Sequence, residues 1–549
     1  MRYLVTGKQA AKIDRYTIEE IGVPQLVLME RASLAVAEEA QRVVRDPKHD
    51  RILVVVESGN NGGDGVAAAR ILHQRGFRVD VWALKGIRKA SDAYQKQAEL
   101  AEKAGVSFTD EPHLESYRMV IDAIFGVGLT REVEGIQKEA VDRINAAKED
   151  NPEMTVMAVD IPSGISSETG EILGAAVKAD RTVTFGYEKV GMGFAREYCG
   201  AVSVHEIGFF LPDHVLLYNT YDRQDVHRLL PKRSPEGNKG SFGRVLVVAG
   251  SKDMSGAAFL AAEAAYRTGC GLVKVITHES NRPALQQLLP EALLHTYREE
   301  EKAFEITEDI RWASVVILGP GIGQSEQAWT LTETVLREAT CPVIVDADAI
   351  NLLSEHTELL TETAGQRPLI LTPHMLEMTR LVEGTVHPER SAMEGLKRDR
   401  IRIAEKTAES YRATVVLKDA CTLVTEGNRD RIDAADPPVH GRTWKERSMS
   451  AGTDGNEERT IYGTYLNSTG NDAMAKGGSG DVLTGVIAGL IAQGLTPEQA
   501  ARLGVHIHGL AGDAARKSRG RYGVIARDLI ESLSEVTDQD PRALQQHRT

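Results

Sequence analysis

The sequence predicts an α/β protein built from two domains, each containing a parallel β-sheet. Two series of short apolar runs alternate with amphipathic segments, one from Arg51 to about Gly208 and the other from about Arg244. Such alternation is typical of doubly wound parallel sheets. The length of 549 residues exceeds what one compact core holds, and 50 glycines against 19 prolines favour many strand-to-helix turns.

The first series is preceded by two expected helices, Lys8–Arg15 and Glu30–Val44. Its expected strands are the apolar runs Ile52–Val56, Val79–Ala83, Met119–Asp122, Thr155–Val159, Thr182–Phe185 and Ala201–Glu206. Helices are expected between them at Val66–Arg75, Asp92–Ala104 and Ile136–Ala147.

The second series predicts strands at Val245–Ala249, Val273–Thr277, Val315–Leu318, Val343–Val345, Leu369–Leu371 and Thr414–Leu417. Between the two series, Leu211–Ser234 holds few regular apolar repeats and is flanked by prolines, so we expect domains at 1–222 and 223–549. Glu426–Thr460 is polar and contains Pro437-Pro438, which predicts a solvated, mobile excursion from the second domain.

The composition excludes several classes of protein. Lys and Arg total 65 against 79 Asp and Glu, so the net charge of -14 argues against a nucleic-acid or anionic-membrane binder. No apolar run reaches the roughly 18 residues of a membrane span, and Met1–Lys8 lacks the features of a secretory signal. The 4 cysteines stand singly, which predicts buried side chains in a reducing cytoplasm rather than zinc or disulfide sites.

Three loops of the first domain follow predicted strands and carry polar residues or glycines: Gly59–Gly65, Ala123–Arg131 and Asp160–Gly164. Glycines let the backbone approach a ligand, and a following helix start offers free N–H groups to a phosphate. A plain βα turn, the alternative, needs fewer glycines than the first loop has. Because ligands bind beyond the carboxyl ends of parallel strands, these loops predict one site.

The side chains in these loops offer oxygen chemistry. The Asn61 amide, the Asp122 carboxylate and the Ser163 hydroxyl suit a hard, weakly held cation. Asp160 stands at a strand end, where a carboxylate can work as a general acid or base. The alternative for Asp160 is an aspartate that merely starts the turn before Pro162.

The motifs Asn60–Gly65, Asp122–Leu129 and Val159–Gly164 resemble the NAD(P)H-hydrate epimerase family over nearly all of 1–215. The resemblance implies a Rossmann-like sheet and epimerisation of the R and S hydrates of NADH and NADPH at nicotinamide C6. It implies a catalytic Asp160 assisted by Lys189, and potassium held by Asn61, Asp122 and Ser163. The implied substrate contacts are Asp160 with Asn60, Asn61, Gly62, Gly63, Asp64, Gly126, Val127, Gly128, Leu129, Thr130, Arg131 and Glu132.

The strongest pattern in the second domain is Gly477-Gly478-Ser479-Gly480-Asp481, which precedes a predicted helix at Val482–Ala492. Successive glycine N–H groups at a helix start form an anion hole for a transferring phosphoryl group. Asp481 at its mouth can take a proton from a substrate hydroxyl. The alternative is a glycine-rich helix start that the aspartate caps.

Together with Leu318–Gly323, Leu371–Glu377 and Asn467–Asn471, this element resembles the ribokinase-like, ADP-dependent NAD(P)H-hydrate dehydratases over roughly 240–530. The resemblance implies that Asp481 deprotonates the ring hydroxyl and that ADP phosphorylates it, with Mg²⁺ bridging the phosphates. Loss of phosphate then restores NAD(P)H and leaves AMP. The implied contacts are Ala257, Gly323, His374 and Asp481 for the hydrate, and Lys418, Asp419, Ala420, Cys421, Thr422 and Gly480 for ADP.

Some of these assignments have plainer alternatives. Lys418 fits an ordinary strand-end lysine and His374 a structural histidine, while Asp419 replaces the glycine common in its loop. For the whole chain, one alternative is a ribokinase-like small-molecule kinase with a regulatory nucleotide-sensing first domain. Another is a scaffold without activity, which the retained polar residues of the first domain disfavour. We expect a cytoplasmic homo-oligomer that acts on hydrated NAD(P)H and ADP.

Overall fold

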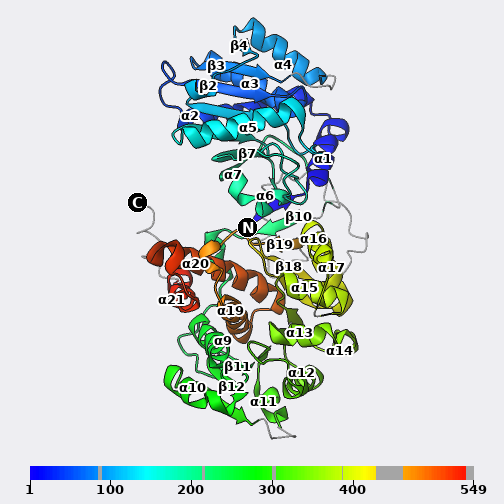
Figure 1. Cartoon of the computed structure of the whole chain (residues 1–549), viewed down its shortest axis with the longest axis vertical. Helices are drawn as coiled ribbons and strands as arrows, with labels where there is room; N and C mark the ends of the chain where they lie inside the picture. Colours follow the sequence, from blue (N-terminus) through cyan, green and yellow to red (C-terminus); the bar gives the residue numbers. More distant parts are fainter. Residues whose placement is uncertain are drawn as a thin grey trace. The chain divides into compact units, whose positions relative to one another are not determined.

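The computed structural model describes residues 1–84, 90–212, 215, 217–298, 305–385, 387–427 and 462–538. The chain divides into two compact units. The N-terminal unit is Tyr3–Tyr218, and the C-terminal unit combines Met1–Arg2 with the described residues from Asn219 onward. Both units are α/β with largely parallel sheets, which confirms the predicted fold class (Figure 1). Most of the predicted excursion Glu426–Thr460 lies outside the described residues.

The sheet of the N-terminal unit has the strand order β4-β3-β2-β5-β6-β7-β9, and its neighbours pair in parallel. Its strands are β2 (Arg51–Val56), β3 (Arg78–Ala83), β4 (Ser107–Thr109), β5 (Met119–Ala123), β6 (Thr155–Val159), β7 (Arg181–Phe185) and β9 (Ala201–His205). All the predicted strands are confirmed. Outside this seven-stranded sheet, β1 (Arg2–Val5) pairs in parallel with β8 (Glu188–Lys189).

Helices cover both faces of this sheet. Along β2, Val54 packs in the core shared with α2 and α3, whereas its neighbour Val55 packs in the core shared with α5. This alternation is the period of two that any strand imposes on its side chains. The helices are α1 (Gly7–Arg15), α2 (Gln25–Val43), α3 (Asn60–Gln74), α4 (Asp92–Lys103), α5 (Gly135–Asp150), α6 (Val190–Phe194) and α7 (Arg196–Cys199).

Helix α3 begins at Asn60, six positions before the predicted start at Val66, so most of the glycine-rich segment is helical. Asn and Gly disfavour helix interiors by propensity, which explains the late prediction. The early start depends on close packing, because a Cβ on Gly62 would stand 1.7 Å from the Glu57 carbonyl oxygen. The first turn of the helix is therefore pressed against the end of β2.

The sheet of the C-terminal unit begins with the order β13-β12-β11-β14-β15-β16-β17-β18-β19. Pairing is parallel as far as β17 and antiparallel from β17 to β18 and from β18 to β19. The strands are β11 (Arg244–Val248), β12 (Leu272–His278), β13 (Leu293–Tyr297), β14 (Val315–Leu318), β15 (Val343–Val345), β16 (Leu369–Leu371), β17 (Thr414–Leu417), β18 (Leu423–Glu426) and β19 (Tyr462–Leu466). The predicted strands are confirmed, and the sequence missed β13, β18 and β19.

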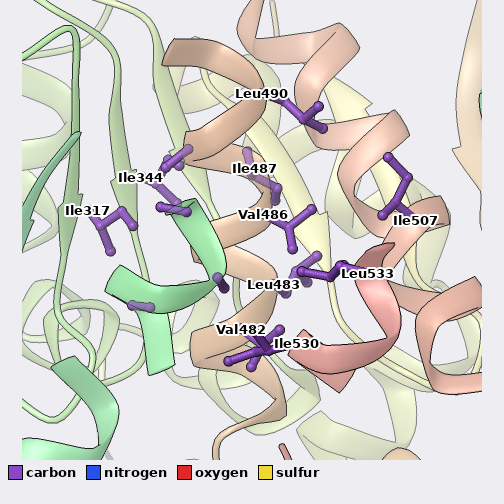
Figure 2. Packing of buried hydrophobic residues seen from close by; sticks show 14 of the residues in the cluster. Ile317, Ile344, Val482, Leu483, Val486, Ile487, Leu490, Ile507, Ile530 and Leu533 are labelled. Atoms are coloured by element: carbon purple, nitrogen blue, oxygen red, sulfur yellow. The ribbon is translucent and has the colours of Figure 1, made fainter. Parts of the chain in front are cut away.

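Helix α19 (Ser479–Ala492) is the central helix of this unit. Figure 2 shows Val486 and Ile487 of α19 between Ile317 and Ile344 of the sheet and the side chains of α20 and α21. The remaining helices of the described chain are α8 (Arg223–Leu229), α9 (Ser255–Thr268), α10 (Arg282–Leu288), α11 (Thr307–Trp312), α12 (Glu326–Glu338), α13 (Asp348–Ser354), α14 (Thr357–Glu362), α15 (Met375–Glu383), α16 (Arg390–Arg398), α17 (Arg400–Tyr411), α20 (Pro497–Gly523) and α21 (Ala526–Thr537).

The stretch Leu211–Ser234, in which the sequence has few regular apolar repeats, contains β10 (Leu217–Thr220) and α8. Asn219 is fully buried, and its Nδ2 donates to the carbonyl oxygen of Gly463 at 3.2 Å. Arg2 pairs with Asp222 at 2.7 Å. The chain thus enters the C-terminal unit at Asn219. Among the described residues, no helix has both the length and the apolar character needed to cross a membrane.

Candidate functional sites

In the N-terminal unit, the loops after β2, β5 and β6 lie at one edge of the sheet, as the sequence predicts. Asp122 of β5 is fully buried. Its carboxylate accepts hydrogen bonds from Ser163 Oγ at 2.6 Å, Ser163 N at 2.8 Å and Ile124 N at 3.2 Å. Burial raises the pKa of Asp122 to about 6. Within the described chain no lysine or arginine pairs with it, so this carboxylate has only neutral partners.

Asn61 lies beside the second of these loops. Its Oδ1 is 3.2 Å from the point where a Cβ on Gly126 would stand, and its buried Nδ2 has no partner among the described residues. Glycine at 126 therefore lets the loop approach the Asn61 amide. The structure brings Asn61 beside Gly126 and bonds Asp122 to Ser163.

Asp160 and Lys189 form an ion pair at the end of β6. Lys189 is only 2% exposed, and its Nζ also donates to Thr184 Oγ1 at 2.7 Å. Asp160 has a φ of 66°, a left-handed conformation that aspartate tolerates better than most residues. Lys189 is thus the ion-pair partner of Asp160, the carboxylate that the sequence analysis proposed as an acid or base.

Two more carboxyl groups face Asp160. Burial, and then repulsion by Asp160 and Asp14, raise the pKa of Asp64 well above its usual range. The pKa of Asp14 on α1 is raised by burial and by Asp160. Sequence reasoning missed Asp14, because nothing in the local sequence of α1 links it to the strand ends. The site therefore offers carboxyls that differ in how readily they ionise, which is the arrangement acid–base chemistry uses.

The other predicted contacts of this unit lie around the same edge. Gly62 and Gly63 are buried under the start of α3, and Leu129 is buried in the loop after β5. The exposed positions of that loop are Gly128, Thr130, Arg131 and Glu132. Val127 is anchored because its carbonyl oxygen accepts from Ser167 Oγ at 3.1 Å.

In the C-terminal unit, the carboxyl ends of β14 to β17 converge on the start of α19. Gly478 precedes the helix with a φ of 91°, which favours glycine. A Cβ on Gly480 would stand 3.3 Å from Lys418 Nζ. The ammonium group of Lys418 therefore lies directly at the predicted anion hole.

A buried carboxylate holds that lysine. Lys418 Nζ donates to Asp346 Oδ1 at 2.5 Å, and Thr372 Oγ1 donates to the same oxygen at 2.7 Å. Asp346 is 1% exposed and directly follows β15. Sequence reasoning missed it, although the rule that singled out Asp160, a polar residue directly after a buried strand, applies here too.

Asp481 and Glu377 are both hard to ionise. Burial, and then repulsion by Asp346, raise the pKa of Asp481 to about 7. Burial raises the pKa of Glu377 to about 7, although Lys418 acts in the opposite direction. A carboxyl whose pKa lies near 7 is suited to accept and return protons at neutral pH.

His374 caps helix α15. Its Nδ1 accepts from Leu376 N at 3.1 Å and from Glu377 N at 3.2 Å, and its Nε2 lies 3.2 Å from Glu377 Oε1. Burial and the charge of Lys418 lower the pKa of His374 to about 4, so the ring is neutral at pH 7. His374 therefore has a structural role as a helix cap. It also lies beside Lys418, because the two residues form an isolated β-bridge.

The predicted contact Ala257 lies against the loop that carries the other predicted contact, Gly323. A Cβ on Gly321 would stand 2.9 Å from the Ala257 side chain, which places the start of α9 against the loop after β14. Gly323 has a φ of 77°, and its N–H donates to Asp348 Oδ2 at 2.9 Å. Sequence reasoning also missed Asp348.

The implied ADP contacts at 419–422 differ in exposure and bonding. Asp419 pairs with Arg400 at 3.0 Å, and its carbonyl oxygen accepts from Thr422 Oγ1 at 3.2 Å. Ala420 is exposed, whereas the side chain of Cys421 is buried. A ligand on this segment would meet the backbone of Cys421 rather than its thiol.

A cavity of about 730 Å³ lies at the opposite edge of the N-terminal sheet. Its lining includes Arg42, Arg118, Lys148, Asp180 and Arg181, most of them already in ion pairs. This cavity lies at the amino ends of the strands, whereas the loops described above follow their carboxyl ends.

Each unit matches a known protein family. Residues 25–191 match the family model described as YjeF-related protein N-terminus, and residues 245–434 and 460–535 match that of NAD(P)H-hydrate dehydratase. The bifunctional NAD(P)H-hydrate repair enzyme Nnr of Moorella thermoacetica is 33% identical, covering 97% of this chain and 96% of its own. The protein of that name from Coxiella burnetii is 33% identical over 97% of this chain and 99% of its own. A solved ADP/ATP-dependent NAD(P)H-hydrate dehydratase from Bacillus subtilis, co-crystallized with ATP/Mg²⁺, is 27% identical and has a TM-score of 0.44; it covers 61% of this chain and 99% of that chain.

Proposed function

Because the chain belongs to the family of bifunctional NAD(P)H-hydrate repair enzymes, we propose a specific role for each of its two sites. The protein epimerises the R and S hydrates of NADH and NADPH and dehydrates the S hydrate with ADP. The N-terminal unit carries the epimerase and the C-terminal unit the dehydratase. The observation that best supports the second assignment is Lys418 Nζ beside Gly480 at the start of α19.

In the dehydratase site, Asp481 takes the proton from the C6 hydroxyl of the hydrate. That oxygen attacks the β-phosphoryl group of ADP, and AMP leaves. The transfer turns the C6 hydroxyl into a phosphate, which is a far better leaving group than hydroxide. The N–H groups at the start of α19 and the ammonium of Lys418 stabilise the charge on the transferring group. Loss of phosphate from C6 and of a proton from the neighbouring carbon then restores NAD(P)H. Ala257, Gly323 and His374 hold the hydrate, and 418–422 with Gly480 hold ADP.

Mg²⁺ fits this site as a partner of the nucleotide. Among the described residues, no three His, Cys, Asp or Glu side chains gather to bind a metal by themselves. Mg²⁺ commonly takes one or two carboxylates together with phosphates and water, so it would arrive on the phosphates of ADP. Glu377, a buried carboxylate beside His374, is the one that would help to hold it, and the ion would neutralise charge on the phosphates.

In the epimerase site, Asp160 serves as the acid–base group at the reacting ring, and Lys189 holds the Asp160 carboxylate in place. The buried ion pair and the neighbouring carboxyls Asp64 and Asp14 support this role. The loop segments 60–64 and 126–132 enclose the nucleotide. Gly62 brings the start of α3 close to β2, which aims its N–H groups at the phosphates of the substrate.

Potassium would bind at Asn61, Asp122 and Ser163. A fully buried carboxylate with only neutral partners is costly, and a monovalent cation would offset that cost. The neutral oxygens of an amide and a hydroxyl suit a weakly held cation. There the ion would fix the loop that carries Gly126.

The deciding experiment supplies purified protein with mixed R and S hydrates and ADP and records the near-ultraviolet absorbance of reduced nicotinamide. Both epimers are expected to be converted, with one AMP and one phosphate formed per NAD(P)H. A stable phosphorylated hydrate would instead identify the C-terminal unit as a kinase. Without ADP, the two epimers are expected to interconvert and no NAD(P)H to appear.

We also propose that the protein works in the cytoplasm as a homo-oligomer. All of its cysteines are free thiols, which suits a reducing compartment. Exposed apolar side chains gather in sequence around the start of α2, at Ile21, Leu26 and Val27, and suit contact with a second copy. Light scattering tests the oligomeric state, because a monomeric mass would refute this proposal.

A further inference from the structure

The turn after β15 carries two aspartates that point to different parts of the dehydratase site. Asp346 accepts from Lys418 Nζ at 2.5 Å and from Thr372 Oγ1 at 2.7 Å. Asp348, two positions on, accepts from Gly323 N at 2.9 Å. One short turn is therefore bonded both to the lysine at the anion hole and to the glycine loop after β14.

The backbone between these aspartates is strained. Ala347 has φ 50° and ψ -119°, values that L residues rarely adopt. The turn is also tightly packed, because a Cβ on Gly319 would stand 2.0 Å from the Asp346 carbonyl oxygen. The two carboxylates on either side of Ala347 bond to different partners, Asp346 to Lys418 and Asp348 to Gly323. Outliers of this kind persist where the surrounding structure holds them, and they cluster at functional sites.

Asp346 is buried next to the start of α19, where it can hold the ammonium group of Lys418 in place. It is 1% exposed, and a Cβ on Gly480 would stand 3.8 Å from its Oδ2. A free lysine ammonium swings on a long flexible chain, whereas one bonded to a buried carboxylate keeps one position. The carboxylate and Thr372 thus fix Lys418 Nζ at the start of α19.

We propose that Asp346 and Asp348 are positioning residues of the dehydratase site. Asp346 holds the Lys418 ammonium where the phosphates of ADP bind, and Asp348 holds the Gly323 loop where the hydrated nucleotide binds. The inference rests on the proposed roles of Lys418 and Gly323. It assigns the two ends of one turn to the two substrates, so each end is expected to affect a different KM.

The test is a double-mutant cycle with steady-state kinetics in both substrates. Asp346→Asn is expected to raise KM for ADP about tenfold or more, the scale of a lost charge-assisted hydrogen bond, and to leave KM for the hydrate within about twofold. Lys418→Met is expected to do the same. The double variant Asp346→Asn/Lys418→Met is expected to be no worse than Lys418→Met alone, because Asp346 acts through the lysine. Asp348→Ala is expected to raise KM for the hydrate and not KM for ADP.

A matched control separates positioning from general loss of structure. Lys274 and Asp309 form another partly buried pair in the same unit, at 2.7 Å, and Asp309→Asn is expected to lower the melting temperature without changing either KM. If Asp346→Asn fails to fold, the double variant, which removes both charges, still gives the comparison with Lys418→Met.

Two kinds of result would contradict these expectations, and they have different meanings. Additive effects of Asp346→Asn and Lys418→Met, or equal rises in both KM values for Asp346→Asn or for Asp348→Ala, would overturn the inference. A Lys418→Met variant with normal KM for ADP would instead remove the proposed role of Lys418, whatever the aspartates do.

Discussion

Lys189 and Asp160 are 29 positions apart in the sequence, yet their charged groups meet inside the N-terminal unit. Lys189 lies on β8, the partner of β1, whereas Asp160 follows the buried strand β6. Thr184 donates to the same carboxylate oxygen at 3.2 Å. The catalytic carboxylate proposed from the sequence therefore has a fixed cationic partner.

Asp160→Asn is expected to slow epimerisation by about 10²–10⁴-fold, the scale of a lost acid–base group. Lys189→Met is expected to slow it as well, because the Asp160 carboxylate loses the partner that holds it. Asparagine tolerates the left-handed conformation of position 160, so the fold is expected to persist. The rate of R-to-S conversion, followed by chromatography, measures the effect. ADP-dependent dehydration of the S hydrate is expected to stay normal, and Lys274→Met, which breaks an ion pair in the other unit, serves as control. An undiminished epimerisation rate would remove Asp160 from the mechanism.

Dehydration is expected to depend on pH through Asp481. Its pKa is raised to about 7, so below that pH the carboxyl is protonated and cannot accept the hydroxyl proton. kcat/KM for the S hydrate should therefore fall as pH drops through about 7, in Glu377→Gln as well as in the natural protein. Asp481→Asn should abolish dehydration and leave R and S interconversion intact. A profile that stays flat down to pH values near 4 would contradict the role of Asp481.

Potassium is expected to matter for the N-terminal unit alone. Replacing it with tetramethylammonium at the same ionic strength should raise KM for the hydrate in epimerisation, because Asp122 would lose its cation. Dehydration of the S hydrate should not change. Asp122→Asn is expected to abolish the difference between the two salts. Equal KM values of the natural protein in both salts would count against a cation site.

Each unit is expected to keep its activity when residues 1–222 and 223–549 are produced separately. Mixed together, they should repair both epimers, because the hydrates diffuse freely between them. A second C-terminal piece that starts at Asn219 should be more stable to urea by about 1–3 kcal/mol, since it keeps the Asn219 bond to Gly463. Pieces that are folded by circular dichroism but fail together on the R hydrate would show that the sites need one chain.

Close helix packing around α19 predicts a large effect of one methyl group. A Cβ on Gly485 would stand 2.3 Å from the carbonyl oxygen of Ala261, so Gly485→Ala should destabilise the C-terminal unit by about 1–3 kcal/mol or more. At Gly395 of α16 the added Cβ meets no neighbour, and Gly395→Ala should stabilise the helix by up to about 1 kcal/mol. Urea denaturation measures both. A neutral Gly485→Ala would mean that α9 and α19 can separate without cost.

The sequence predicted the parallel sheets well because their strands are buried apolar runs. β6 was predicted with the bounds it has, Thr155–Val159. Among the strands that were missed, β13 is only partly buried, since Leu293 is 48% exposed, whereas β18 and β19 are buried and pair antiparallel beyond β17. Their pairing depends on neighbouring strands rather than on their own residues, so no local pattern indicates them. The start of α3 was missed because contact with Glu57 outweighs the low helix propensity of Asn and Gly.

Some residues of the proposed sites could likewise be predicted from the local sequence, and others could not. Motifs that follow one strand, such as Asn60–Asp64 or Gly477–Asp481, are visible in sequence because glycine and polar residues crowd together. Asp346 and Lys418 are 72 positions apart, and Asp14 lies on a helix before the first sheet, so only the folded chain brings them to the sites. Such partners could be sought at every strand end, but their bonds could not be predicted from spacing.

The pairing of Arg2 with Asp222 has a practical consequence for labelling. The chain begins in the C-terminal unit, passes into the N-terminal unit at Tyr3 and returns at Asn219. Met1 and Arg2 thus belong with the dehydratase unit, although the epimerase unit follows them in the sequence. A fluorophore attached at position 2 would therefore report on unfolding of the dehydratase unit. Its signal would be misassigned to the epimerase unit if it were interpreted from its position in the sequence alone.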